Sequence, residues 1–309
     1  MTLASDGGRQ HRSIHRASWS AWYPATVHGT RRLARRLQSV PRSVQVIWHD
    51  PANRDRKVRR VARYGAVRTL GLIARRPFAV RYGDRSRIWI RPDSSSASVY
   101  LRSPVPDFAE MQVWKRHLRT RDVFVDVGAH LGAYTIWAIE QGAEVIAIEA
   151  DPTMASHLVS NLELNGYEAE VHAVAVAHKP GTMLLNGPDQ SRQALLVRGG
   201  VGTEVVVDTL DRLLGQRQAA GLKIDVEGAE RLVLEGASRI LADARIPLIQ
   251  LEWNSESERT LDEDRRPLRD LLLGAGYELL RPDADGNLLP VDALGYGADV
   301  FARATGPGG

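Results

Sequence analysis

The sequence predicts a doubly wound, Rossmann-like α/β fold built on a mostly parallel sheet. The apolar run from Val123 to Val127 has the β-branched and aromatic composition of a strand that is buried on both faces. A glycine turn and a helical pattern follow it directly, up to Ile139. Beyond Glu149, apolar runs alternate with helical patterns, which is typical of strands joined by crossover helices.

The turn after the first strand has the properties of a ligand-binding loop. Gly128 and Gly132 can take positive φ and let a ligand approach the backbone closely. From Ala133 onward the apolar residues recur at helical spacing, so the loop lies at a helix N-terminus. The free N–H groups of that end can bind an anion.

The spacing of this loop bears on which nucleotide it binds. A dinucleotide fingerprint would read G-x-G-x-x-G, whereas here Asp126 and Gly128 precede Gly132, with His130 between the glycines. Asp126 would repel a pyrophosphate but suits the ammonium group of a methionine moiety. Glu149 ends the next apolar run, 17 residues after Gly132, where an acid can accept hydrogen bonds from both ribose hydroxyls of an adenosine. At this level a Rossmann dehydrogenase remains an alternative.

Upstream of the loop, the patterns predict helices and one hairpin. The N-terminal Trp19, Trp22 and Tyr23 could form a contact site or a small cluster packed on the body. The expected elements are helices at 30–40, 50–76 and 107–118, a hairpin at 78–93 turning at Gly83-Asp84, and a loop at 94–100.

Downstream, strands and helices alternate to the end of the chain. Thr209 is expected to cap a short helix over 210–214. The other expected helices are 152–164, 229–241 and 266–273. The expected strands are 169–176, 182–185, 205–207, 222–225 with a glycine turn up to residue 228, 247–253, 277–280 and 299–302.

The composition is that of an ordinary globular protein, with 43% apolar residues and no cysteine. The absence of cysteine excludes disulfides, thiolate zinc sites and cysteine nucleophiles, and it fits a reducing cytoplasm. No run approaches the roughly 18 apolar residues of a membrane helix, and the N-terminus lacks the apolar core of a secretion signal. We therefore expect a cytoplasmic protein without a membrane span.

Charge divides the chain into two parts. Residues 1–76 carry 17 Lys and Arg against three Asp, a net charge of +14, whereas the remainder carries −10. A basic segment of this kind can bind nucleic acid or anionic lipid, but it more often forms a solvated helix or docks on its own protein, which is the interpretation we favour. The predicted organisation is a basic extension at 1–40, a helical and hairpin lead-in at 41–120, and a catalytic domain at 121–309.

Several motifs together resemble one family, the FkbM-type S-adenosylmethionine-dependent methyltransferases. They are DVGAHLGAYT at 126–135, IEADP at 148–152, VDTLDRLL at 207–214, KIDVEGAE at 223–230 and the acid of LEWN at Glu252, and the similarity extends upstream to HDPANR at 49–54 and DFAEM at 107–111. The resemblance covers about residues 49–309. It implies the class I methyltransferase fold, with a seven-stranded, mostly parallel sheet and an antiparallel C-terminal strand.

The resemblance also implies S-adenosylmethionine as the methyl donor. The residues expected to bind it are Asp126, Gly128, His130, Gly132, Glu149 and Asp225. Many members of the family have asparagine where this chain has His130, and we favour a loop histidine that hydrogen-bonds the backbone over a catalytic one.

The expected reaction is O-methylation of a hydroxyl of a small metabolite, sugar or natural product. The transfer needs an aligned acceptor and a base, and the candidate catalytic carboxylates are Asp225, Glu227 and Glu252. The three could also hold a divalent cation, although no spacing demands a metal and none is assigned. The alternatives are methylation of a nucleic acid or other polyanion through the basic N-terminal region, which we favour less, and a non-catalytic cofactor-binding protein.

Overall fold

The computed structural model describes residues 40–74, 76–91, 95–186, 196–197, 202–291 and 295–306. The three N-terminal aromatic residues and most of the helix expected at 30–40 lie outside this part of the chain. The first described helix, α2 (Val40–His49), begins where that expected helix was predicted to end. Pro41 did not stop a helix there because proline is well tolerated in a first helical turn.

The architecture centres on a sheet of eight strands within the described residues, in the order β13-β12-β14-β11-β10-β3-β4-β5. The strands β3, β4, β5, β10 and β11 are mutually parallel, and β14 is antiparallel to both of its neighbours. This order confirms the predicted class I methyltransferase fold, with β13 as an added edge strand. The bounds are β3 (Val123–Val127), β4 (Glu144–Ile148), β5 (Glu170–His172), β10 (Gly221–Ile224), β11 (Leu248–Leu251), β12 (Tyr277–Pro282), β13 (Leu288–Pro290) and β14 (Val300–Ala304).

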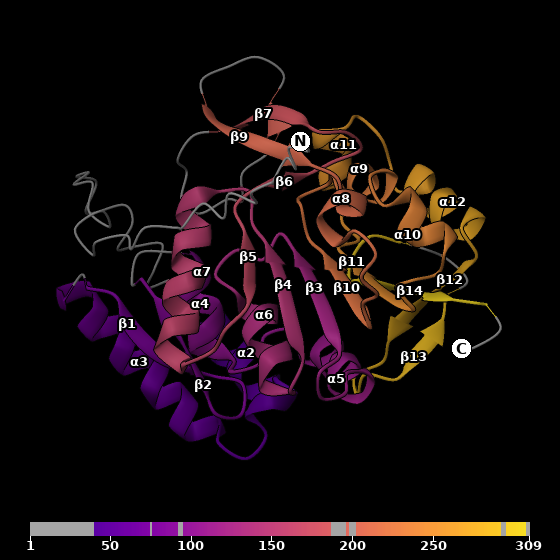
Figure 1. Ribbon diagram of the computed structural model, residues 1–309. Helices are drawn as coiled ribbons and strands as arrows, with labels where there is room; N and C mark the ends of the chain where they lie inside the picture. Colours follow the sequence, from indigo (N-terminus) through magenta and orange to yellow (C-terminus); the bar gives the residue numbers. More distant parts are fainter. Residues whose placement is uncertain are drawn as a thin grey trace.

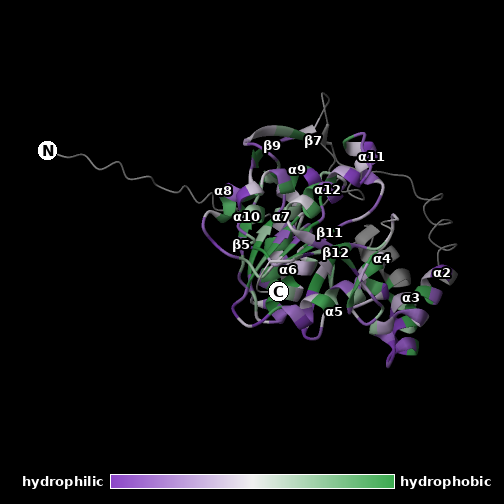
Figure 2. Cartoon of the chain, turned by 90° about the vertical axis from the view of Figure 1, so that its right-hand side faces the viewer, coloured by the Kyte–Doolittle hydropathy of each residue, from purple (hydrophilic) through white to green (hydrophobic). Residues whose placement is uncertain are grey.

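Helices cover both faces of this sheet, as the apolar strands require. Along β3, Phe124 belongs to one buried cluster with Trp114 and Trp137, whereas Val125 belongs to a second cluster on the other face with Val233. Figure 2 shows the hydrophobic colour concentrated on the inner strands. The first face carries α5 (Phe108–His117), α6 (Ala133–Glu140) and α7 (Pro152–Asn165), and the second carries α8 (Leu210–Leu214), α9 (Glu230–Glu235), α10 (Ser238–Ala242) and α12 (Arg266–Gly274).

A second sheet of four described strands, β6-β9-β7-β8, lies beyond the carboxyl end of β5 (Figure 1). The strand predicted at 169–176 is therefore wrong as a single element. It divides because Ala175 pairs with Val207 of β9 instead of continuing along β4. The bounds are β6 (Ala175–Val176), β7 (Gly181–Asn186), β8 (Leu196–Val197) and β9 (Gly202–Asp208).

The helix predicted at 229–241 is also divided, into α9 and α10. The break falls at Gly236, where an added Cβ would lie 2.2 Å from the carbonyl oxygen of Ala177. The chain approaches the second sheet too closely there for a continuous helix with side chains. A short helix that the sequence did not predict, α11 (Glu256–Thr260), follows β11.

The N-terminal elements gather beside the β4–β5 side of the sheet, drawn in indigo in Figure 1. The hairpin is confirmed as β1 (Phe78–Tyr82) and β2 (Ser86–Ile90). The helix predicted at 50–76 begins instead with a separate turn, η2 (Pro51–Asn53), whose N-cap is Asp50, followed by α3 (Lys57–Ala74). The loop predicted at 94–100 is wrong, because α4 (Ser95–Arg102) is helical and packs on α2, α3 and the hairpin. None of the helices in the described ranges is both long and apolar enough to cross a membrane.

Candidate active site

The predicted site residues meet at one edge of the central sheet. Gly128 follows β3 directly, Glu149 follows β4, Asp225 follows β10 and Glu252 follows β11. Because these four strands are parallel, their carboxyl ends lie side by side, which is where ligands bind in open α/β sheets.

A polar row crosses the inside of the sheet just below this edge. Lys223 is directly paired with Asp126 of β3 on one side and with Gln250 of β11 on the other. Lys223 is 4% exposed, and its ammonium group lies 2.8 Å from Asp225 Oδ2 and 4.6 Å from the ring centroid of Tyr134. Burial lowers the pKa of Lys223, but the negative charges of Asp225 and Asp126 outweigh burial, so the net pKa is raised. Lys223 therefore stays charged and compensates the surrounding carboxylates.

The glycine loop needs its glycines for conformation and for space. Gly128 has φ +79°, and a Cβ there would lie 1.8 Å from the carbonyl oxygen of Asp225. Gly132 has φ +85° at the start of α6, where a Cβ would lie 3.1 Å from Leu158. Because Gly128 has no side chain, the backbone that follows β3 can lie directly beside the end of β10.

Asp126 is almost completely buried between the loop and α6. Its Oδ2 accepts a hydrogen bond from Thr135 Oγ1 at 2.7 Å, while its Oδ1 has no partner among the described residues. Burial raises the pKa of Asp126, and Lys223 opposes that rise. A buried carboxylate oxygen without a partner is costly, so the site fits a ligand that brings a donor such as an ammonium group.

Glu149 is held by the backbone of both loops that flank it. Its Oε2 accepts from the N–H of His130 at 2.7 Å and its Oε1 from the N–H of Asp151 at 2.8 Å. Each oxygen keeps one further acceptor position, enough for two ribose hydroxyls. Burial raises the pKa of Glu149 to about 7. His130 contributes to this contact through its backbone, at φ +51°, and burial lowers the pKa of its ring.

The three candidate catalytic carboxylates come together. One oxygen each of Asp225, Glu227 and Glu252 lie within 4.8 Å of one another, an arrangement with the donor atoms that a divalent cation prefers. Burial, followed by the charges of Asp225 and Glu256, raises the pKa of Glu227 to about 7. Burial and then Asp225 and Glu227 raise the pKa of Glu252 to about 9. Glu252 Oε2 is buried without a partner in the described structure.

Hydrogen bonds from neighbouring residues hold the loop that carries Glu227. Glu227 has φ +52°, and its carbonyl oxygen accepts from Thr260 Oγ1 at 2.8 Å. Glu230, fully buried, accepts from the N–H groups of Val226 and Gly228 and is paired with Arg265. The carboxylate of Glu230 thus holds the loop in place. Glu227 is the acid of this loop that lies beside Asp225 and Glu252.

Sequence reasoning did not assign Lys223, Gln250 or Asp299 to the site. Gln250 donates to the hydroxyl of Tyr134 at 2.9 Å and to Asp299 Oδ2 at 2.7 Å, and burial raises the pKa of Asp299 to about 7. The signal for two of them was in the sequence, because a lysine inside LKI and a glutamine inside LIQL interrupt strands that are otherwise apolar.

Comparison with known proteins agrees with this arrangement. Residues 126–279 match the methyltransferase FkbM domain. The ribosomal RNA small subunit methyltransferase A of Kineococcus radiotolerans is 28% identical over 142 residues, which are 46% of this chain and 46% of that protein. The protein of the same name from Streptomyces avermitilis is 27% identical over 143 residues, 46% of this chain and 47% of that protein. The chain thus spans less than half the length of these curated relatives.

Solved structures are also similar to this chain. Trm5b from Pyrococcus abyssi has a TM-score of 0.40 and 14% identity, with 74% of this chain and 55% of that chain covered. The magnesium protoporphyrin IX methyltransferase of Synechocystis, with bound S-adenosylmethionine, has a TM-score of 0.39 and 12% identity, covering 64% of this chain and 76% of that one.

Proposed function

Since this chain belongs to the FkbM methyltransferases and is an S-adenosylmethionine-dependent enzyme, we propose that it methylates a hydroxyl group of a small metabolite, sugar or natural product. The observation that carries this proposal is the meeting of Asp225, Glu227 and Glu252 at the carboxyl ends of β10 and β11. A hydroxyl oxygen must lose its proton as it takes up a methyl group, so an O-methyltransferase needs a base at this position.

The residues around the glycine loop fit the methyl donor. Asp126 would face the ammonium group with its free oxygen, Glu149 would accept from the ribose hydroxyls, and Gly128, His130 and Gly132 would line the loop, with Asp225 beside the reaction centre. When bound, the donor supplies an electrophilic methyl group on a sulfonium. What the chain itself provides is alignment of the acceptor and removal of its proton.

The carboxyls divide into two roles by their pKa values. Glu227, with a pKa of about 7, is ionised in part near neutrality and is suited to accept the acceptor's proton. Glu252, with a pKa of about 9, is mainly protonated at that pH and can donate a hydrogen bond that orients the acceptor. Asp225, fixed by Lys223, would orient the hydroxyl from the third side.

Electrostatics at this edge favour a neutral acceptor over a phosphate-bearing group. The acids here are compensated within the described residues chiefly by Lys223, so a phosphate close to the transferring methyl would be repelled. A nucleic acid acceptor is the second candidate, because the curated relatives with detectable similarity are ribosomal RNA methyltransferases. In that case the phosphates must lie away from the three carboxylates.

The proposal is tested by methyl transfer from labelled S-adenosylmethionine to a panel of sugars and hydroxylated natural products, with RNA as a comparison acceptor. We expect label on a hydroxyl oxygen, and a loss of about 10²- to 10⁴-fold in kcat for Glu227→Gln. Glu258→Gln, which changes an exposed acid of α11 outside the trio, is the matched control and should keep most of the activity. Label recovered on a nucleobase nitrogen would contradict the proposal.

The same assay separates a base from a metal ligand. Activity that persists in EDTA, with Glu227→Gln inactive, supports direct proton removal by Glu227. Activity that is lost in EDTA and restored by Mg²⁺ would assign Asp225, Glu227 and Glu252 to a divalent cation instead.

A further inference from the structure

A basic surface lies on the N-terminal elements, apart from the candidate active site. It is formed by the start of α3 and the outward face of the β1–β2 hairpin. We call it the arginine surface, and it comprises six residues: Arg56, Arg59, Arg60, Arg63, Arg81 and Arg87.

These arginines are close enough to repel one another. Burial, and then the charges of Arg63 and Arg81, lower the pKa of Arg60. Burial, and then Arg59 and Arg81, lower the pKa of Arg63. On the hairpin, Arg81 and Arg87 are directly paired across the two strands, both exposed, and like charges in that position are destabilising.

The arginine surface lacks the acids that neutralise arginines elsewhere in the described structure. None of its six guanidinium groups forms an ion pair within the described ranges, and Asp50 is the acid that acts on Arg60. Among the described residues, the hydrogen bond that the guanidinium of Arg81 donates goes to a backbone oxygen of the turn, at Asp84. By contrast, several arginines of the C-terminal half form ion pairs: Arg231 with Glu263, Arg266 with Asp264, Arg269 with Asp270 and Arg303 with Glu278.

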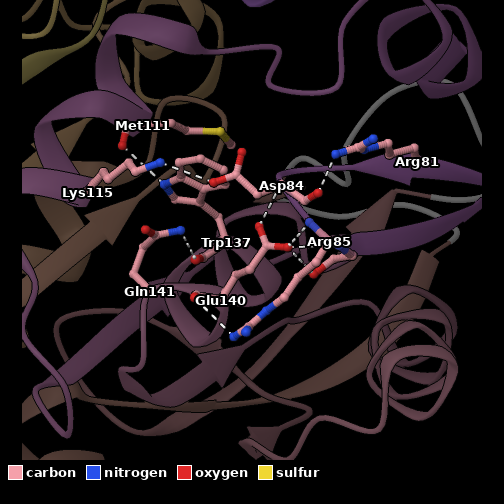
Figure 3. A network of polar contacts seen from close by, with 9 residues as sticks. Arg81, Asp84, Arg85, Met111, Lys115, Trp137, Glu140 and Gln141 are labelled. Carbon is pink, nitrogen blue, oxygen red and sulfur yellow. Dashed lines mark hydrogen bonds and ion pairs between the residues drawn. The ribbon is translucent and has the colours of Figure 1, made fainter.

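The hairpin that carries part of this surface is held rigidly. Figure 3 shows the carboxylate of Glu140, at the end of α6, accepting from the backbone N–H groups of Asp84 and Arg85, and it also accepts from the N–H and hydroxyl of Ser86. An added Cβ at Gly83 would lie 2.1 Å from that carboxylate. The charges are therefore presented in a fixed geometry, which lowers the entropic cost of binding.

The same hairpin joins the arginine surface to the active-site side of the fold. Arg81 points outward, whereas the next residue, Tyr82, is fully buried and its hydroxyl donates to the carbonyl oxygen of Ala133 at 2.8 Å. Ala133 begins α6, directly after the glycine loop. Strand β1 thus carries Arg81 of the arginine surface on its outer side, and through Tyr82 it contacts the start of α6 next to the proposed cofactor loop.

We propose that the arginine surface binds the phosphodiester backbone of a nucleic acid. Guanidinium groups bind phosphate oxygens bidentately, and a row of unneutralised arginines on a helix and a hairpin matches a chain of phosphates. The competing occupant is an anionic bilayer, suggested by exposed Val46, Trp48 and Val58 and by Lys57 beside Trp48. The six arginines outnumber these three apolar side chains, so a backbone of phosphates is the better match. Binding at the arginine surface does not depend on the proposed hydroxyl acceptor.

The test is fluorescence anisotropy of the full chain with a labelled single-stranded RNA of about 20 nucleotides at several salt concentrations. Each phosphate contact contributes about −0.7 to the slope of log K against log salt for a single strand. The triple variant Arg59→Gln/Arg63→Gln/Arg87→Gln should therefore reduce the slope by about 2 and weaken binding roughly a hundredfold at about 0.1 M salt.

Two controls separate the surface from net charge and from the N-terminal extension. Arg266→Gln/Arg269→Gln/Arg303→Gln removes the same charge from ion-paired positions and should change the affinity by less than about threefold. Arg31→Gln/Arg32→Gln/Arg35→Gln removes three positive charges from the N-terminal extension. It should weaken RNA binding less than the arginine-surface variant does. Equal weakening by the ion-paired control, or loss only in the extension variant, would overturn the proposal.

Absence of RNA binding by the folded wild type at about 50 mM salt would also overturn it. So would preferential sedimentation with phosphatidylserine vesicles together with no RNA binding, because that pattern identifies a bilayer as the occupant. Thermal unfolding of each variant shows that the fold is retained, and the surface variant should be no less stable than the wild type because it removes mutual repulsion.

Discussion

The carboxyl edge of the central sheet and the arginine surface are two concentrations of charge of opposite sign with different surroundings. At the sheet edge, Asp225 and Asp126 surround one buried lysine, Lys223, which compensates them. On the arginine surface, Arg60 and Arg63 are half-buried beside further arginines and lack an acid of their own in the described structure.

The comparison indicates that the two regions meet different ligands. At the sheet edge, the buried oxygens Asp126 Oδ1 and Glu252 Oε2 lack a hydrogen-bond partner within the described residues, so this edge suits a ligand bound through a few directed hydrogen bonds. The arginine surface leaves whole charges uncompensated, so it suits a polyanion bound through many similar contacts. One chain could therefore bind cationic S-adenosylmethionine at the sheet edge and a phosphate backbone on the arginine surface without competition between them.

The largest expected effect comes from removing the charge that balances the sheet edge. Lys223→Met leaves buried Asp126 and partly buried Asp225 without compensation and should lower the free energy of unfolding by about 3–5 kcal/mol. Lys115→Met, which removes an exposed lysine paired with Asp84, should cost no more than about 1 kcal/mol. Urea unfolding measures both, and equal losses would show that Lys223 is not the compensating charge.

The pH dependence of turnover is expected to be bell-shaped. Below about pH 7, Glu227 becomes protonated and loses its capacity as a base, so kcat/KM should fall tenfold per pH unit. Above about pH 9, Glu252 loses the proton with which it would orient the acceptor, so kcat/KM should fall again.

Two variants assign the limbs of that profile. Glu252→Gln keeps a neutral donor and should remove the alkaline limb, whereas Glu227→Gln should remove the acidic limb together with most of the rate. A profile that Glu252→Gln leaves unchanged would contradict the role given to Glu252.

The smallest expected effect is a stabilisation on the arginine surface. Arg87→Thr removes one of two like charges that face each other across the hairpin and introduces a β-branched residue, so the free energy of unfolding should rise by about 0.2–1 kcal/mol. Thermal melts at low and high salt check this, since screening should reduce the gain. A loss of stability would contradict the mutual repulsion of Arg81 and Arg87.

Most of the central sheet was predictable from the sequence because its strands are short apolar runs that end in glycine or acid. Gly128, Glu149, Asp225 and Glu252 were placed together by one rule, that parallel strands share their carboxyl edge. The N-cap at Thr209, whose hydroxyl accepts from Arg212 N–H, was predictable from residue type alone.

The errors arose where tertiary contacts override local pattern. Helix 229–241 is broken by the approach of Gly236 to Ala177, which no periodicity encodes. The run at 169–176 divides because its second half pairs with β9, a strand about 30 residues further along the chain. Lys223 belongs to the motif that identified the family, but its partners Asp126 and Asp225 could be assigned only from strand register and side-chain geometry.

Calorimetric titration with S-adenosylhomocysteine measures whether the methyl donor binds at this sheet edge through Glu149. We expect micromolar binding by the wild type, at least a tenfold weaker Kd for Glu149→Ala, and an unchanged Kd for Glu144→Ala, whose side chain is exposed at the other end of the same strand. No binding by the folded wild type, or equal affinities for all three proteins, would contradict it.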